Sequence, residues 1–139
     1  MKRVVLDTNV VVSACFWRGP SWQCLEAWAS GTFTALVSPP LLTEYVEVFE
    51  RLQQRYPDKR YVDWVSALRD AADLVFPALK IPDAFPDPDD AILAECAVAG
   101  EADYLVSGDK EHVQAAGEVR GIPMLSPVRF LEVLGAADS

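Results

Sequence analysis

The sequence predicts an α/β protein, a three-layer α/β/α sandwich built around a five-stranded parallel sheet. Five short apolar segments alternate along the chain with segments whose apolar residues recur at helical spacing. The strand segments are continuously apolar, as in parallel strands covered on both faces, and lack the alternation of a half-exposed sheet. With 139 residues, 51% of them hydrophobic, the chain has the size of one domain, so we expect residues 1–139 to form a single unit.

The first half of the chain supplies two of the predicted strands and two helices. Residues 3–6 form a short apolar strand, and Asp7 opens a polar stop with helix-capping character after it. Residues 20–30 carry apolar side chains at helical spacing between a proline start and a glycine stop. Residues 33–37 predict the second strand, and a Ser-Pro-Pro sequence at 38–40 predicts the capped start of the next helix.

The second half supplies the other three strands. Residues 56–71 contain a helical pattern, and residues 73–76 predict a third strand that is closed by a proline. A proline-rich loop then leads into an acidic helix start, which is followed by an apolar helix over residues 91–99. Residues 104–107 and 123–125 predict the fourth and fifth strands, and a last helix runs to residue 134.

Carboxylates from separate regions of the chain are predicted to meet at one edge of this sheet. In a doubly wound sheet, ligands bind at the carboxyl ends of the strands. Asp7 follows the first strand directly, and Asp109 follows the fourth strand by two residues. Asp90 begins the helix that leads to the fourth strand. Glu44 lies about one and a half turns into the helix after the second strand, near the same edge.

Such a group of acids suits metal-dependent hydrolysis of a phosphodiester. The reaction needs a water made nucleophilic near neutral pH and charge stabilisation in the transition state, and divalent ions supply both. Mg²⁺ and Mn²⁺ take oxygen ligands and keep several waters, so a few carboxylates suffice. We expect Asp7, Glu44 and Asp90 to bind a first ion. Asp109 would bind a second ion or the attacking water.

Two neutral side chains stand beside these acids, and each acid also has a purely structural interpretation. Asn9 and Ser107 are suited to orienting a carboxylate or the scissile phosphate. Asp7 and Asp109 could instead only cap helices, and Asp89 next to Asp90 could only favour a helix N-terminus through its dipole. The collective interpretation is stronger, because like-charged carboxylates at one edge repel one another unless a cation joins them.

Charge and cysteine content narrow the class of protein. The chain has 12 Lys and Arg against 21 Asp and Glu, a formal net charge of -9 that disfavours simple electrostatic binding of a polyanion. Bound divalent cations would cancel part of that charge at the site. Three widely spaced cysteines and a single histidine, His112, leave a zinc site short of ligands. We expect a soluble, cytoplasmic protein without a membrane span, since no run approaches the ~20 apolar residues of a membrane helix.

Four short motifs, each occurring once, follow one another along the chain in a recognisable order. They are Val-Val-Leu-Asp7-Thr8-Asn9, Glu44 within Leu-Leu-Thr-Glu-Tyr, Asp87-Pro-Asp89-Asp90-Ala-Ile-Leu, and Leu-Val-Ser107-Gly-Asp109-Lys. In this order and spacing they resemble the PIN domain family, in particular the toxin components of bacterial toxin-antitoxin systems. The resemblance spans the chain from Val4 to about Leu134.

The resemblance implies a Mg²⁺- or Mn²⁺-dependent endoribonuclease that hydrolyses RNA. It also implies a five-stranded parallel sheet, a homodimer, and neutralisation of the toxin by a small antitoxin protein. The family's site residues fall on Asp7, Glu44, Asp90 and Asp109, with Asn9 and Ser107 as polar neighbours and Asp89 as the alternative to Asp90.

Other functions of an acidic pocket stay open. A metal-dependent phosphatase of the haloacid type also places an aspartate after its first strand, but it needs a second aspartate where this chain has Asn9. A receiver-like regulatory domain would use Lys110, but its phosphoacceptor aspartate should follow the third strand, where Phe76-Pro77 stands. A further alternative keeps the fold without catalysis and leaves an acidic pocket that only binds a partner.

Overall fold

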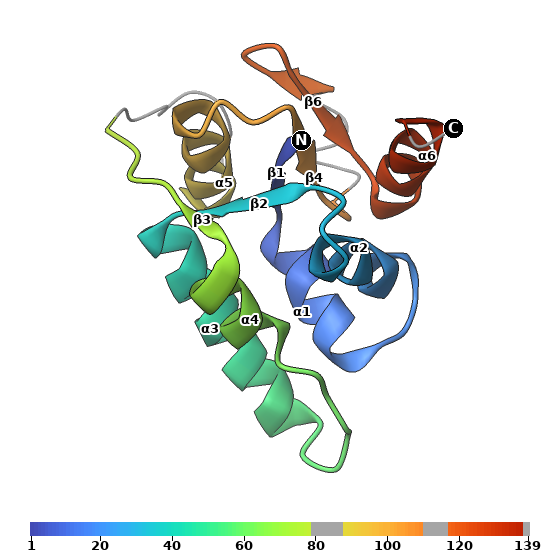
Figure 1. The fold of residues 1–139 in the computed structure, drawn as a ribbon. Coiled ribbons are helices and arrows are strands. Elements are labelled where there is room, and N and C mark those ends of the chain that lie inside the picture. Colours follow the sequence, from blue (N-terminus) through green and yellow to red (C-terminus); the bar gives the residue numbers. More distant parts are fainter. Residues whose placement is uncertain (79–87, 110–116, 138–139) are drawn as a thin grey trace.

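The computed structural model describes residues 1–78, 88–109 and 117–137 (Figure 1). Six strands and six helices follow one another along these residues. The strands are β1 (Arg3–Leu6), β2 (Thr34–Val37), β3 (Asp73–Leu74), β4 (Tyr104–Val106), β5 (Glu118–Val119) and β6 (Ile122–Leu125). The helices are α1 (Thr8–Phe16), α2 (Pro20–Ala29), α3 (Pro39–Arg55), α4 (Trp64–Ala71), α5 (Pro88–Ala99) and α6 (Pro127–Ala137).

The strands form one mostly parallel sheet in the order β3-β2-β1-β4-β6-β5. The predicted α/β class with a parallel sheet is confirmed, but the sheet has six strands where five were predicted. The additional strand, β5, pairs antiparallel with β6 across a turn at Arg120 and Gly121, whose φ angles are 47° and 83°. Positive φ at both central residues is the type I′ geometry of tight hairpins. Because arginine rarely adopts this conformation, the sequence gives little sign of the hairpin.

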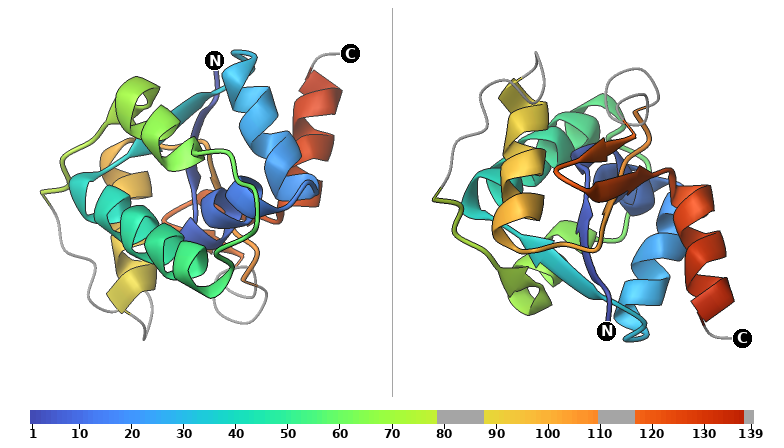
Figure 2. Two further views of the ribbon diagram at one scale, coloured as in Figure 1. Left: turned by 90° about the horizontal axis from the view of Figure 1, so that it is seen from below. Right: turned by 90° about the horizontal axis from the view of Figure 1, so that it is seen from above.

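Helices cover both faces of the sheet (Figure 1 and Figure 2). On one side, α1 contacts α2 and α4, and α2 contacts α6. On the other side, α5 packs against β1 and β2. The long helix α3 contacts α1 and α4 as well as α5, so it closes the end of the sandwich between the two helical layers. This arrangement is the predicted three-layer sandwich.

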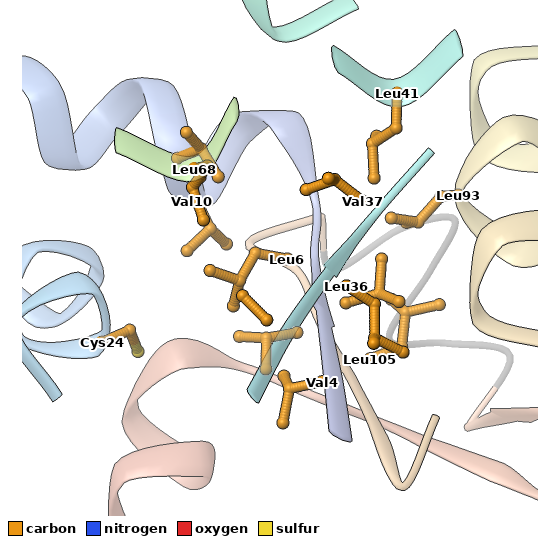
Figure 3. Close-up of a cluster of buried hydrophobic side chains, with 14 of the residues drawn as sticks. Val4, Leu6, Val10, Cys24, Leu36, Val37, Leu41, Leu68, Leu93 and Leu105 are labelled. Carbon is orange, nitrogen blue, oxygen red and sulfur yellow. The ribbon is translucent and has the colours of Figure 1, made fainter. Parts of the chain in front are cut away.

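The central strands are buried because apolar side chains on both of their faces meet helices. The apolar residues of β1 are at most 1% exposed. Figure 3 shows Leu6 of β1 pointing toward Val10 of α1 and Leu68 of α4. In the same view, Leu36 of β2 points toward Leu93 of α5. Burial on both faces explains why these strands are continuously apolar in the sequence.

Two segments are shorter than the sequence predicts. The helix expected over residues 56–71 begins only at Trp64, where the Asp63 side chain caps it by accepting the Ser66 N–H at 2.9 Å. Just before Trp64, the Val62 N–H donates to the Cys15 carbonyl at 2.9 Å, so a tertiary hydrogen bond holds this segment against the end of α1. The strand expected over residues 73–76 keeps only its first two residues, at the edge of the sheet, and Phe76 is left 72% exposed.

Several other predicted helix boundaries are confirmed, although α6 runs to Ala137, past its predicted end at residue 134. Pro20 begins α2, and Gly31, with φ of 82°, follows its end. Ser38 caps α3, since its Oγ accepts the Leu41 N–H at 3.3 Å, and α5 begins at Pro88 within the predicted acidic start. Across residues 1–78, 88–109 and 117–137, no helix combines the length and the apolar character that crossing a membrane requires.

Candidate active site

The winding of the sheet reverses between β1 and β4. The chain adds β2 and β3 on one side of β1, then returns to add β4 and β6 on the other side. The carboxyl ends of strands at such a reversal border a crevice in which ligands bind. Leu6 and Val106 are paired in register, so Asp7 and Ser107 leave the sheet next to each other. The Asp7 N–H extends this pairing by donating to the Val106 carbonyl at 2.8 Å.

A hydrogen-bonded cluster of side chains occupies this end of the sheet. Ser107 Oγ donates to Asp7 Oδ2 at 2.6 Å and accepts the Asp109 N–H at 3.0 Å. Asn9 Nδ2 donates to Asp7 Oδ2 at 3.2 Å, and Asn9 Oδ1 accepts the Gly108 N–H at 2.9 Å. The structure thus brings together four of the predicted site residues, Asp7, Asn9, Ser107 and Asp109, from two neighbouring strand ends.

Asp7 is the buried acid of this cluster, with 9% of its surface exposed. Its Oδ1 caps α1 by accepting the Thr8 N–H at 2.7 Å, while its Oδ2 faces Ser107 and Asn9. Burial raises the pKa of Asp7 above its ordinary value of 3.8, and the Asp109 carboxylate raises it further, against the opposing effect of these hydrogen bonds. Asp7 therefore serves both as a helix cap and as one of two mutually repelling carboxylates.

Glu44 reaches the same region from α3. Its neighbour Tyr45 is fully buried, and the Tyr45 hydroxyl donates to the carbonyl of Leu6, the last residue of β1. Burial raises the pKa of Tyr45 well above its usual range, and Cys96, Asp7 and Glu44 add to the rise. Asp7 and Glu44 are thus both close enough to act electrostatically on one phenol.

Asp90 lies in the first turn of α5 and is 9% exposed. Because α5 crosses back along the sheet to enter β4, its first turn lies toward the carboxyl ends of the parallel strands. Glu44 and Ile92, two residues beyond Asp90, line a common hollow of about 340 Å³ between α3 and α5. Four residues named from the sequence lie outside the described part of the structure, at least in their side chains: Asp87, Asp89, Lys110 and His112.

The donor chemistry of the cluster fits a hard divalent cation. Asp7 and Asp109 carry like charges close enough to raise the pKa of Asp7, and a cation bound there would relieve both that repulsion and the burial of the charge. Oxygen donors suit Mg²⁺ and Mn²⁺. Within the described residues, no three acidic, histidine or cysteine side chains come close enough together to enclose an ion. A cation here would keep several waters, as Mg²⁺ usually does.

The structure adds two residues that the motifs do not single out. In the sequence, Tyr45 is one more apolar position of its helix, yet its hydroxyl holds the carbonyl that ends β1. A buried tyrosine needs a hydrogen-bond partner, which is the signal that could have identified it. Gly108 contributes only its backbone N–H, to Asn9, and a backbone donor leaves no trace in a side-chain motif.

Together these features define an α/β/α domain with an acidic cluster at the reversal point of its sheet. The family model described as PIN domain matches residues 3–111, which include the whole hydrogen-bonded cluster. The chain belongs to the PIN domain family. Among curated proteins, none matches the chain significantly.

Membership of this family carries a general function. PIN domains are generally nucleases, that is, hydrolases, so the chain has a nuclease-type fold and a nucleic acid is the implied substrate. PIN domains typically use divalent metals, in agreement with the oxygen donors of the cluster. The match therefore favours a nuclease over the phosphatase and receiver-like alternatives.

Proposed function

We propose that this PIN domain is a metal-dependent endoribonuclease that hydrolyses RNA. The observation that carries the proposal is the hydrogen bond from Ser107 to Asp7 across the ends of β4 and β1, which holds a buried carboxylate close to Asp109. A helix cap alone requires no second carboxylate. Two acids placed together disfavour each other's charged form, and a bound cation would offset that effect.

The metal ligands of the proposal are the four acids named from the sequence, Asp7, Glu44, Asp90 and Asp109, with Asp89 as the alternative to Asp90. They would hold Mg²⁺ or Mn²⁺. When bound, such an ion neutralises charge on the scissile phosphate and lowers the pKa of a coordinated water.

The residues around Asp7 prepare the site for this chemistry. Ser107 and Asn9 both donate to Asp7 Oδ2, so they favour its ionised form and fix its orientation. Asp109, held by its N–H on Ser107, would accept a hydrogen bond from the attacking water and orient it. Hydrolysis then forms one P–O bond to the oxygen of that water and breaks one P–O bond of the RNA backbone.

The resemblance to bacterial toxins extends the proposal to a biological role. Under this extension, residues 1–139 form one nuclease domain that dimerises and acts as the toxin of a toxin-antitoxin pair. Expression of the chain should arrest growth, and co-expression of a small antitoxin from a neighbouring reading frame should relieve the arrest. Expression of Asp7→Asn at the same level should have no effect on growth.

Cleavage of a mixed RNA substrate tests the enzymatic proposal directly. The purified wild type should cut in the presence of Mn²⁺ or Mg²⁺, and Asp7→Asn and Asp90→Asn should each cut at least ~100-fold more slowly, since metal sites tolerate changes of their ligands poorly. Asp70→Asn makes the same charge change at an exposed position of α4 and should cut normally. If the wild type cuts nothing with either metal, the chain is a catalytically silent domain. If the two site variants cut as fast as the wild type, Asp7 and Asp90 do not belong to the active site.

A further inference from the structure

A hollow bordered by aromatic and basic side chains lies at the end of α1 opposite Asp7. It has a volume of about 360 Å³ and lies between the last turn of α1 and the loop that precedes α4. Lys59 stands beside it, over the ring of Trp17. We name the following six side chains the aromatic-basic platform: Trp17, Arg18, Trp22, Lys59, Arg60 and Tyr61.

Tertiary contacts hold the two parts of the platform together. The N–H of Val62 donates to the carbonyl of Cys15 at 2.9 Å. The ring centroids of Phe16 and Tyr61 lie 5.9 Å apart. Figure 1 shows the loop between α3 and α4 beside the connection from α1 to α2. The platform is therefore built into the fold, although its residues come from distant parts of the sequence.

Aromatic surface and positive charge coincide on the platform. Trp17 and Tyr61 are 43% and 49% exposed. Such exposure is unusual for large aromatic side chains, because burying them removes a large apolar area from water. The Arg18 guanidinium lies 4.6 Å from the ring centroid of Trp22, and Lys59 Nζ lies 5.2 Å from that of Trp17. Bases of single-stranded nucleic acid stack on aromatic rings and on guanidinium planes, and their phosphates pair with nearby cations.

The platform is basic although the chain as a whole is acidic. Residues 14–22 and 55–63 contain four of the 12 Lys and Arg residues and two carboxylates, Asp58 and Asp63, in a chain of net charge -9. Among the described residues, Arg18, Lys59 and Arg60 form no ion pair with a carboxylate, whereas Arg69 and Arg129 pair with acids on their own helices. Unpaired cations at one place on an acidic protein favour a polyanionic ligand.

Helix α1 connects the platform to the acidic cluster. Asp7 caps the start of α1, and Trp17 caps its end. The nine residues of this helix span about 14 Å, so one strand can reach both sites with a few nucleotides between them. A duplex keeps its bases stacked on one another, so its bases are not free to stack on protein rings.

We propose that the aromatic-basic platform binds single-stranded nucleic acid beside the cleavage site. Bases stack on Trp17 and Tyr61, and phosphates contact Lys59 and the guanidinium of Arg18, which lies over the ring of Trp22. The inference rests on the proposed nuclease function, because that function brings a nucleic acid to α1. The platform supplies positive charge for binding a nucleic acid on a chain whose net charge is -9.

Fluorescence anisotropy with a short labelled oligouridylate tests the platform. Binding is measured with the full chain in EDTA, so that no cleavage interferes. Trp17→Ala should bind about tenfold more weakly, the expected effect of losing one stacked base. Arg18→Gln with Lys59→Gln should reduce the slope of log K against log salt by about 1.4, for two lost phosphate contacts.

Matched variants control for general effects of charge and exposed aromatic area. Arg69→Gln with Arg129→Gln also removes two positive charges, but from exposed positions away from the platform, and this variant should bind as the wild type does. Phe76→Ala removes an aromatic side chain that is 72% exposed at the sheet edge and should also leave binding unchanged. Thermal melts of all variants exclude loss of fold as the cause of any change.

Two results would overturn the inference. If Trp17→Ala binds the strand as tightly as the wild type, the platform is a docking surface for another macromolecule, such as a protein partner. If the same strand annealed to its complement competes equally well, stacking on single strands is not the mode of binding. Because the assay needs no cleavage, a platform that binds RNA on a protein that cuts none refutes the nuclease proposal alone. Cleavage by the wild type together with unaltered binding by the variants refutes the platform alone.

Discussion

Replacing Ser107 by alanine tests the cluster at a buried hydrogen bond. Ser107 is fully buried, and its hydroxyl donates to Asp7 at 2.6 Å and accepts the Asp109 N–H at 3.0 Å. A hydrogen bond to a charged group contributes about 2 kcal/mol to stability. For a domain of this size that loss corresponds to a fall in Tm of about 7 °C. We expect this fall for Ser107→Ala in EDTA at neutral pH.

The stability difference between Ser107→Ala and the wild type should depend on pH, and this dependence distinguishes loss of the hydrogen bond to Asp7 from a simple packing defect. The hydrogen bond from Ser107 lowers the pKa of Asp7, so the Asp7 pKa is higher in Ser107→Ala than in the wild type. The two folded proteins therefore differ most when Asp7 is ionised, and they differ least when it is protonated in both. The deficit should be full at neutral pH, should shrink as the pH falls through the raised folded pKa of Asp7, and should be smallest at and below the ordinary value of 3.8.

The assay is thermal unfolding followed by circular dichroism across this pH range, with Ser66→Ala as the control. Ser66 Oγ also donates to an aspartate, Asp63 Oδ2 at 2.8 Å, but on an exposed helix start. Its replacement should change stability by no more than about 0.5 kcal/mol. If Ser107→Ala has the same Tm as the wild type at neutral pH, or if its Tm is lower by the same amount at every pH, the hydrogen bond does not stabilise an ionised Asp7.

Four further substitutions test the Asp7 carboxyl, the Tyr45 hydroxyl and the packing of two glycines by urea or thermal unfolding in EDTA. Burial raises the pKa of Asp7 in the folded state, so this carboxyl favours folding below pH 3.8 and loses that contribution as the pH rises through the folded pKa. The Tm of Asp7→Asn should therefore be higher than that of the wild type at neutral pH. The difference in Tm should vanish in acid. Among the described residues, the Tyr45 hydroxyl is the only one that donates to the carbonyl of the last residue of β1. Tyr45→Phe should therefore lower the free energy of unfolding by about 1–3 kcal/mol. A change near zero would mean that water replaces the phenol. A Cβ at Gly100 would lie 2.7 Å from a β2 leucine and 3.1 Å from a backbone carbonyl, so Gly100→Ala should destabilise the fold by about 1–3 kcal/mol. Gly135 lies in α6 with open space around it, so Gly135→Ala should stabilise the fold by up to ~1 kcal/mol. The reverse order of stability would contradict the packing.

The sequence was sufficient for the parts of the fold that depend on local chemistry. Continuous apolar runs identified β1, β2 and β4, because these strands are buried on both faces. Capping residues such as Ser38 located helix starts, since a cap satisfies backbone donors whatever the surrounding fold. The same local rules overextended β3, whose length is set by its one neighbour, β2.

The candidate site was predictable only where side chains follow strand ends. Asp7 and Ser107 come together because parallel pairing of β1 and β4 fixes their positions, and that pairing follows from the α/β pattern. The place of Tyr45 depends on how α3 leans on the end of β1, which no local pattern contains. For the same reason no local pattern predicted the aromatic-basic platform, which is assembled from the end of α1 and a loop some forty residues later.

Isothermal titration calorimetry measures the binding of Mn²⁺ to the acidic cluster without any substrate. The wild type should bind Mn²⁺ at neutral pH, and Asp7→Asn should bind it at least ~10-fold more weakly, because one carboxylate ligand is lost while the fold is kept. Asp70→Asn should bind like the wild type, since its carboxylate is exposed on α4. Equal Mn²⁺ affinity in the wild type and Asp7→Asn would contradict the account, because Asp7 would then be no more than the cap of α1.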